Sequence, residues 1–200
     1  MSKIDKEGIL VDGKVIPRRF PAIEHGKLPG VHAIVVHQTD APTAQHTFNS
    51  YLAGGNGAHF LIDKNGQIYQ TASVQMRCYH VGRLIKSKCL TVNKNNCDSA
   101  SIAKILAMSW GAQIKALDAH ERKKSYPDRY PVNNDSIGIE LVGKSIDAKT
   151  YEAVTPPQIA SLQWLAGELY AHFSVTPNDL YRHPEVSYKN PGEANTAVWK

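Results

Sequence analysis

Histidine and glutamate side chains on strand-like segments are the first candidates for chemistry. His37 ends the apolar run Val31–His37, which predicts a buried strand that delivers the imidazole to its end. Residues alternate in character along Ser136–Val142, so a strand there carries Glu140 on the face opposite its apolar residues. Imidazoles and carboxylates transfer protons and ligate metals. Taken singly, each also fits an ordinary structural histidine or a solvated strand carboxylate.

The three cysteines indicate little chemistry of their own. Cys78, Cys89 and Cys97 are odd in number and lack the C-x-x-C spacing, which argues against a disulfide framework and against a four-thiolate zinc site. We therefore expect reduced, structural cysteines. A bridge between Cys89 and Cys97 would require the chain to reach an oxidising compartment.

Three local patterns predict the elements around these residues. Ala58–Gln70 reads as a β-hairpin whose Asn65-Gly66 pair predicts a type I′ turn. Thr43–Leu52 predicts a helix capped by its threonine. Thr155–Gln158 has the pattern of a capping box and starts a helix with apolar residues at helical spacing as far as Phe173.

The chain divides into a lead-in and one domain. Residues 1–30 are rich in proline and glycine and predict an irregular lead-in, and residues 31–200 form the one expected domain. Within it, residues 83–133 predict an insertion beside the site, with one helix over Ser101–Leu117. Strands and helices interleave, and the hairpin excludes a purely parallel sheet. The expected class is α/β, a single domain with a central mixed sheet flanked by helices.

Composition narrows the class of partner. The 200 residues carry 23 Lys and Arg against 18 Asp and Glu, a formal net charge of +5, and the basic residues are scattered. That distribution disfavours nucleic acid and suits an anionic polymer such as a cell wall. Apolar runs are far shorter than the ~18 residues of a membrane-spanning helix, so we expect no membrane insertion. The first residues lack the apolar stretch of a secretory signal, so we expect no cleaved signal peptide.

Six blocks in register resemble the type 2 N-acetylmuramoyl-L-alanine amidases, whose fold the peptidoglycan recognition proteins share. The resemblance runs from about Val31 to Gly192 and is interrupted only by the insertion. It implies a zinc-dependent enzyme that cleaves the amide between the lactyl group of N-acetylmuramic acid and the L-alanine of the stem peptide. The blocks are Ile34–His37, Ala58–Gly66, Tyr79–Gly82, Asn134–Gly143, Thr155–Gln158 and Arg182–Val186, followed by Lys189.

The resemblance implies a Zn²⁺ cofactor with two histidine ligands, His37 and His183. The family places an Asp or Cys two residues after a lysine that corresponds to Lys189, and this chain departs from that pattern. Glu193 is the favoured third ligand. Asn190 offers only a neutral amide oxygen, and a more distant residue or a two-histidine site completed by water also remains open.

The same resemblance implies roles for five further residues. Glu140 would be the general base that takes a proton from the attacking water and returns it to the leaving amine. Lys189 would stabilise the oxyanion of the tetrahedral intermediate. Tyr79, His80 and Asn134 are the expected substrate-binding residues, although His80 equally fits a packed histidine.

The function expected is therefore a peptidoglycan amidase acting on peptidoglycan or muropeptides. The alternative is a non-catalytic peptidoglycan-binding module of the same fold, motivated by the altered third-ligand position. Cytosolic recycling and phage lysis stay open as biological roles. We favour an antibacterial effector or lytic enzyme that is made in the cytoplasm and exported by a non-Sec route to periplasmic peptidoglycan. An immunity protein would then be a further partner.

Overall fold

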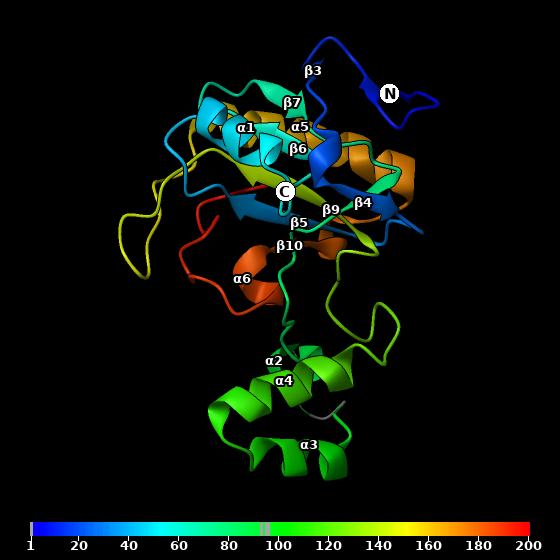
Figure 1. Ribbon diagram of the computed structural model, residues 1–200, viewed down its shortest axis with the longest axis vertical. Helices are drawn as coiled ribbons and strands as arrows, with labels where there is room; N and C mark the ends of the chain where they lie inside the picture. The colour runs from blue at the N-terminus through cyan, green and yellow to red at the C-terminus, as the bar shows by residue number, and fades with distance from the viewer. Residues whose placement is uncertain (1, 93, 95–96) are drawn as a thin grey trace.

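A six-stranded sheet forms the centre of the protein (Figure 1). The computed structural model describes residues 2–92, 94 and 97–200. Adjacent strands are parallel except for one antiparallel pair, β6 with β7, so the sheet is mixed as predicted. The strand order across the sheet is β10 (Leu180–Arg182), β5 (Ala33–Gln38), β9 (Ser136–Leu141), β6 (Phe60–Ile62), β7 (Ile68–Gln70) and β3 (Val15–Pro17).

Helices cover both faces of this sheet, as expected for the α/β class. The long helix α5 (Pro156–Phe173) packs its apolar side against the face that carries Ile34 and Ile139. The opposite face is covered in part by α1 (Ala44–Leu52), whose Phe48 contributes to a second core cluster. His37 and Glu140 alternate with the residues that face α5, so both side chains lie on the α1 side of the sheet.

The caps predicted for the two helices are present. The Thr155 hydroxyl accepts a hydrogen bond from the Gln158 backbone, and the Gln158 side chain accepts one from the Thr155 backbone, which completes the capping box of α5. The Thr43 side chain accepts a hydrogen bond from the backbone of His46 at the start of α1. Both helices therefore begin where the sequence places them.

The predicted hairpin is confirmed, but the type of its turn is wrong. Strands β6 and β7 pair antiparallel, and the Gly66 N–H donates to the Asp63 carbonyl at 2.8 Å. Of Asn65 and Gly66, only the glycine has a positive φ, 87°. A type I′ turn needs two such residues, whereas a left-handed glycine after an ordinary turn needs one.

The expectation of an irregular lead-in over residues 1–30 is also wrong. Strand β3 extends the main sheet beside β7, and the side chains of Leu10 and Val15 are buried in the main core. The strands within residues 1–30 have two to four residues each and are too short to show periodicity in the sequence. They form because their backbone groups pair with other strands. The remaining pairs are β1 (Lys3–Ile4) with β2 (Leu10–Val11) and β4 (Glu24–Lys27) with β8 (Met76–Cys78). A short 3₁₀ helix, η1 (Pro21–Ile23), precedes β4.

The insertion forms a lobe that projects below the sheet (Figure 1). It contains α2 (Lys88–Val92), α3 (Ser99–Leu106) and α4 (Trp110–Glu121). The single helix predicted over Ser101–Leu117 is wrong, because Ser109 has an extended backbone and starts a second helix. That break lets Ile102 and Leu117 fold onto each other in a small core of their own.

A disulfide links Cys89 to Cys97 within this lobe, whereas Cys78 is free and buried. The expectation of reduced cysteines is therefore wrong for two of the three. Eight positions separate the pair in sequence, and the packing of α2 against the lobe core brings them together.

The chain ends in short elements that lead into the site. A 3₁₀ helix, η3 (Pro177–Asp179), precedes β10, and α6 (His183–Val186) follows it directly. Within the described ranges, no helix has both the length and the apolar character required to cross a membrane.

Candidate metal centre

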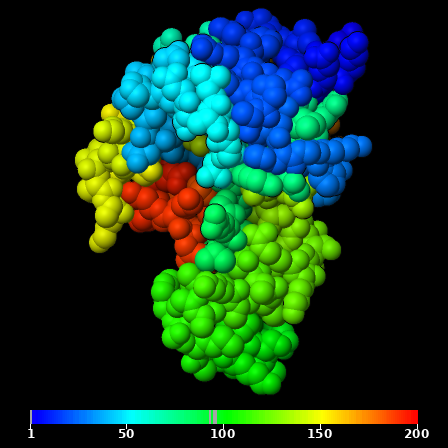
Figure 2. Space-filling model, in the orientation of Figure 1, coloured from blue at the N-terminus to red at the C-terminus, as the bar shows by residue number. Residues whose placement is uncertain are grey.

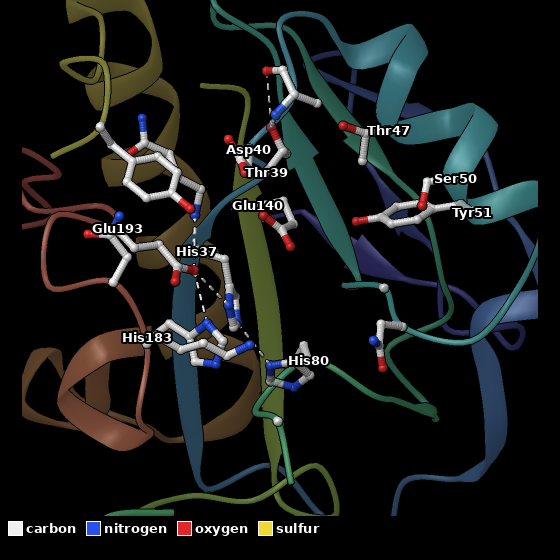
Figure 3. A pocket seen from close by; sticks show the side chains of 18 of the residues that line it. His37, Thr39, Asp40, Thr47, Ser50, Tyr51, His80, Glu140, His183 and Glu193 are labelled. Carbon is white, nitrogen blue, oxygen red and sulfur yellow. Dashed lines mark hydrogen bonds and ion pairs between the residues drawn. The ribbon is translucent and has the colours of Figure 1, made fainter. Parts of the chain in front are cut away.

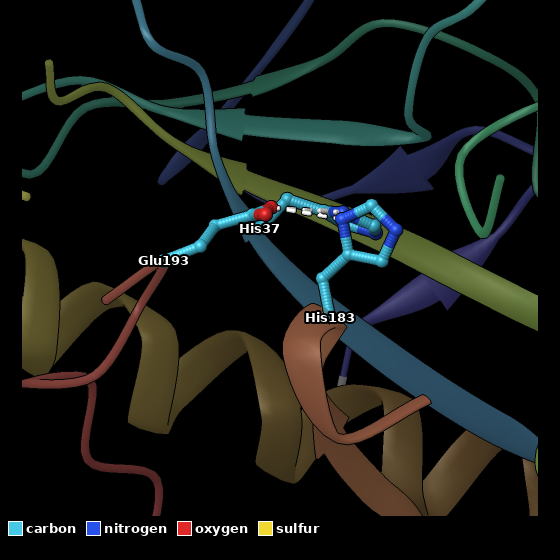
Figure 4. Close-up of side chains that lie close together, drawn as sticks. All are labelled: His37, His183 and Glu193. Carbon is cyan, nitrogen blue, oxygen red and sulfur yellow. Dashed lines mark hydrogen bonds and ion pairs between the residues drawn. The ribbon is translucent and has the colours of Figure 1, made fainter. Parts of the chain in front are cut away.

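Three side chains that can ligate a metal meet at the carboxyl end of β5 (Figure 4). His37 lies near the end of β5, and His183 begins α6 immediately after the neighbouring parallel strand β10. Carboxyl ends of parallel strands share one edge of a sheet, so the two imidazoles converge there. Glu193 joins them, and the ligating atoms of all three residues lie within 4.8 Å of one another and are buried.

The loop after α6 brings Glu193 to the histidines. Its Oε1 lies 2.9 Å from His183 Nδ1 and 3.5 Å from His37 Nδ1. Gln38, the last residue of β5, holds the loop through a hydrogen bond from the Ala194 N–H to its side-chain oxygen at 3.0 Å. The carboxylate is thereby tied to the same strand that carries His37.

The side chain of Asn190, the alternative third ligand, makes hydrogen bonds away from the two histidines. Its side-chain nitrogen donates to the Asp147 carbonyl at 3.0 Å, and its side-chain oxygen accepts from the Gly192 N–H at 2.9 Å. A Cβ at Gly192 would lie 2.3 Å from the Lys149 carbonyl oxygen, so glycine is needed for the loop to pass this close. The structure thus brings Glu193, and not Asn190, to the two histidines.

Hydrogen bonding fixes which nitrogen of His183 faces the cluster. Its Nε2 lies 3.0 Å from the carbonyl oxygen of Val81, which can only accept a hydrogen bond. Nε2 therefore carries the proton, and in the neutral ring Nδ1 presents a lone pair toward Glu193. An outer hydrogen bond of this kind orients a metal-ligating histidine.

A hydrogen bond between two imidazoles likewise fixes which nitrogen of His37 carries the proton. His80 Nε2 lies 3.3 Å from the Ser136 carbonyl, so it donates there and leaves His80 Nδ1 as an acceptor. His37 Nε2 lies 3.1 Å from that nitrogen and donates to it. His37 Nδ1 therefore carries no proton, and its lone pair is directed at the Glu193 carboxylate.

The charge states of the cluster suit a metal. Burial, with a contribution from His183, lowers the pKa of His37 to about 4, so its imidazole is neutral at pH 7. Burial alone would raise the pKa of Glu193, but the adjacent rings of His183 and His37 outweigh it and hold that pKa at about 2. Neutral imidazole and carboxylate are the forms that bind metal. Two such nitrogens and one oxygen fit Zn²⁺, whose tetrahedral ligand atoms lie about 3.3 Å apart.

A cavity of about 510 Å³ opens above the cluster, and Glu140 projects into it (Figure 3). Glu140 and His37 occupy paired positions of β9 and β5, so the carboxyl lies beside the imidazole on the same face. Its Oε2 is buried and has no hydrogen-bond partner among the residues that the structure describes. Burial and the nearby Glu193 raise the pKa of Glu140 to about 8. A half-buried carboxyl with a buried, unpartnered oxygen that faces a cavity is available for proton transfer.

This raised pKa predicts a pH dependence for the metal-free protein. Between about pH 4.5 and 8 the folded state keeps a proton on Glu140 that the unfolded state loses. The free energy of unfolding should therefore contain a component that falls as pH rises, by up to about 1.4 kcal/mol per pH unit. Urea unfolding at pH 6 and pH 8, with wild type and Glu140→Gln compared, isolates this component. Equal pH dependence in the two proteins would contradict the assignment.

The other predicted residues lie at different distances from the cavity. Lys189 is exposed at its edge, and Tyr79, 39% exposed, forms part of its wall. His80 also borders the cavity, but it is buried and directed at His37 (Figure 3). Asn134 is placed outside the cavity, where it accepts a hydrogen bond from Arg77 at 3.0 Å and lines a separate hollow.

Two tyrosines of the cavity wall were missed by the sequence reasoning. Tyr51 extends from α1 toward Glu140 (Figure 3), and its hydroxyl accepts a hydrogen bond from the Ala58 backbone. Burial and Glu140 raise its pKa well above the usual range. Burial and Glu193 raise the pKa of Tyr151 to about 12. The periodicity of α1 marks Tyr51 as buried, but no local pattern says that this face borders a cavity.

A close backbone approach makes Gly138 important for His80. A Cβ at Gly138 would lie 2.8 Å from His80 Cγ, so Gly138→Ala should displace the ring and break its hydrogen bond with His37. We expect the affinity of the cluster for a metal ion to fall by about 10- to 100-fold, the usual cost of losing an outer hydrogen bond of a ligand. Competition with a chromophoric chelator measures this. Gly167→Ala, in α5 with open space around it, is the matched control and should leave the affinity unchanged.

A half-buried carboxyl beside a cluster suited to a metal, in one cavity of a mixed α/β fold, is the arrangement of a hydrolase. The sequence matches the family described as N-acetylmuramoyl-L-alanine amidase over residues 27–195, and the chain belongs to that family. It is an N-acetylmuramoyl-L-alanine amidase, an enzyme that acts on peptidoglycan, as the sequence motifs indicate.

Solved structures share the fold at low sequence identity. A selenomethionine derivative of AmpD has a TM-score of 0.55 and 19% identity, with 96% of each chain covered. The catalytic domain of XlyA has a TM-score of 0.53 and 18% identity, with 88% of this chain and 87% of that one covered. AmpDh3 from Pseudomonas aeruginosa, in complex with anhydromuramic pentapeptide, has a TM-score of 0.52 and 18% identity over 94% of this chain and 59% of its own. No curated protein sequence matches the chain.

Proposed function

We propose that this amidase is zinc-dependent and hydrolyses the amide between the lactyl group of N-acetylmuramic acid and the L-alanine of the stem peptide. The observation that carries the proposal is the convergence of His37, His183 and Glu193 beside the carboxyl of Glu140, whose Oε2 has no hydrogen-bond partner among the described residues. Zinc, when bound, supplies a Lewis acid and lowers the pKa of water to about 7.

Glu140 manages the protons in this proposal. Its carboxylate accepts a proton from the attacking water, and its carboxyl then donates a proton to the nitrogen of the leaving L-alanine. A group that does both needs a pKa near the working pH, and burial brings the Glu140 pKa to about 8. Its lack of a fixed hydrogen-bond partner among the described residues leaves the oxygen free to contact substrate.

Lys189 and Tyr79 act on the substrate from the rim of the cavity. The Lys189 ammonium, on the loop between His183 and Glu193, stabilises the negative oxygen of the tetrahedral intermediate. Tyr79 offers an exposed ring to the muramyl or peptide portion. We assign His80 to the support of His37 instead of to direct substrate contact.

Removal and return of the metal test zinc dependence. The protein should lose release of stem peptide after treatment with a chelator and recover it when about one equivalent of zinc is added back. Activity that survives complete metal removal, verified by metal analysis, would contradict the proposal. Binding of peptidoglycan without cleavage in the zinc-loaded protein would favour the non-catalytic module.

We further propose that the enzyme acts on peptidoglycan outside the cytoplasm, as an antibacterial effector or lytic enzyme. The Cys89–Cys97 disulfide supports this, because disulfides persist mainly in oxidising compartments. A protein that covers the cavity would then protect the producing cell. Expression with a Sec signal in a bacterial host should cause lysis, and expression without it should not. Survival of cells that accumulate the exported protein would contradict this role.

A further inference from the structure

An exposed apolar surface lies at the junction of α3 and α4 in the projecting lobe. Leu106 is 46% exposed, Met108 43% and Trp110 66%. The core of the lobe is built from other side chains, including Ile102 and Leu117. A solvent-exposed tryptophan that its own lobe does not bury is a candidate contact for a ligand.

This surface is continuous with the rim of the cavity. The Trp110 ring meets the Tyr188 ring edge-to-face, with centroids 5.8 Å apart and an angle of 86° between the planes. Tyr188 precedes Lys189, which lines the cavity. The lobe and the C-terminal loop lie against each other in the space-filling view (Figure 2). We call the rings of Trp110 and Tyr188, together with the adjoining Lys189, the aromatic strip.

Positive charge accompanies the aromatic strip. The Lys86 ammonium lies 5.8 Å from the centroid of the Tyr188 ring. Lys86 and Lys189 also line a second hollow, of about 380 Å³. Peptidoglycan strands carry the carboxylates of their stem peptides, so this charge favours the approach of the polymer.

We propose that the aromatic strip is a subsite for polymeric peptidoglycan, with Trp110 and Tyr188 packing against sugar rings next to the muramyl residue that is cleaved. The aliphatic C–H faces of pyranose rings pack well on indole and phenol rings, and the sugar hydroxyls remain in water. The inference rests on the proposed cleavage site, because the strip is placed relative to that cavity. Continuity with the cavity favours the same polymer over an unrelated protein as occupant.

Measurements of kcat/KM on two substrates distinguish a role in this subsite from a role in catalysis. A disaccharide-peptide fills the cavity alone, whereas a longer glycan strand with its stem peptides also reaches the strip. Trp110→Ala should leave kcat/KM for the disaccharide-peptide within twofold of wild type and lower kcat/KM for the longer strand by about 3- to 10-fold. Trp110→Phe should restore most of the loss. Val11→Ala, which truncates an exposed apolar residue on β2, should change neither value.

A binding measurement keeps the test independent of catalysis. The Glu140→Gln protein should co-sediment with purified insoluble peptidoglycan, and the double variant Glu140→Gln, Trp110→Ala should do so with about 3- to 10-fold weaker affinity. Equal binding by the two proteins would overturn the subsite even if the amidase proposal holds. An equal loss of activity on both substrates would also overturn it, because Trp110 would then support the cavity. Unchanged activity on both, with a lost response to an inhibitory protein, would assign the surface to that protein.

Discussion

Replacement of Glu140 by glutamine should lower kcat for release of the stem peptide by about 10²- to 10⁴-fold, the usual contribution of a general acid–base group. Glutamine has nearly the same shape but cannot accept or return the proton. Because Glu140 is in register with His37 but outside the cluster of ligating atoms, zinc binding should change little. Steady-state kinetics on a disaccharide-peptide, with zinc content measured in parallel, checks both statements.

The control for this variant is a carboxylate of similar type on the protein surface. Glu185→Gln removes an exposed carboxylate on α6, two residues after His183, and should retain nearly full activity. A Glu140→Gln enzyme within tenfold of wild type would contradict the proton-transfer role. Loss of zinc from that variant would instead place Glu140 among the ligands.

Replacement of Glu193 by alanine should have the second large effect, on metal affinity. Among the described residues, the cluster then keeps its two imidazoles but loses its carboxylate, and two ligands hold zinc more weakly than three. We expect zinc affinity to fall by more than the roughly 10- to 100-fold cost of losing an outer hydrogen bond. Activity at limiting zinc should fall in proportion and recover in part when zinc is in excess.

The Asn190→Ala variant is the comparison that tests which residue is the third ligand. The Asn190 side chain contacts Gly192 in its own loop and Asp147 in a distant segment, so its truncation should leave zinc affinity within a few-fold of wild type. The two affinities are measured by the same chelator competition. If Asn190→Ala loses zinc and Glu193→Ala keeps it, the third ligand has been misassigned.

The sequence was sufficient for the elements whose signals are local. The strand around Ile137, the capping box at Thr155 and the hairpin that turns at Gly66 each depend on residues close together in the chain. His37 and His183 were located through surrounding motifs, although 146 positions separate them. Parallel pairing of β5 and β10 then places both at the same edge of the sheet.

Features that depend on packing between distant segments were harder to predict. The position of Glu193 beside the two histidines depends on Gln38 and on the tight passage of Gly192, neither of which is a local signal. The hydrogen bond between His80 and His37 joins two distant segments and has no local signal, so the sequence left both substrate contact and packing open for His80. The break before Trp110 went unseen because both new helices keep apolar residues at helical spacing.

Mass spectrometry of purified muropeptides, incubated with the zinc-loaded protein in ¹⁸O-labelled water, tests the central claim most directly. Hydrolysis adds the water oxygen to the lactyl carbonyl carbon and a proton to the departing nitrogen. We expect a free stem peptide that begins with L-alanine, and one ¹⁸O atom in the lactyl carboxyl group of the muramyl product. Chelated protein and Glu140→Gln should give neither product at a comparable rate. Intact muropeptides, or fragments cut at another bond, would contradict the account.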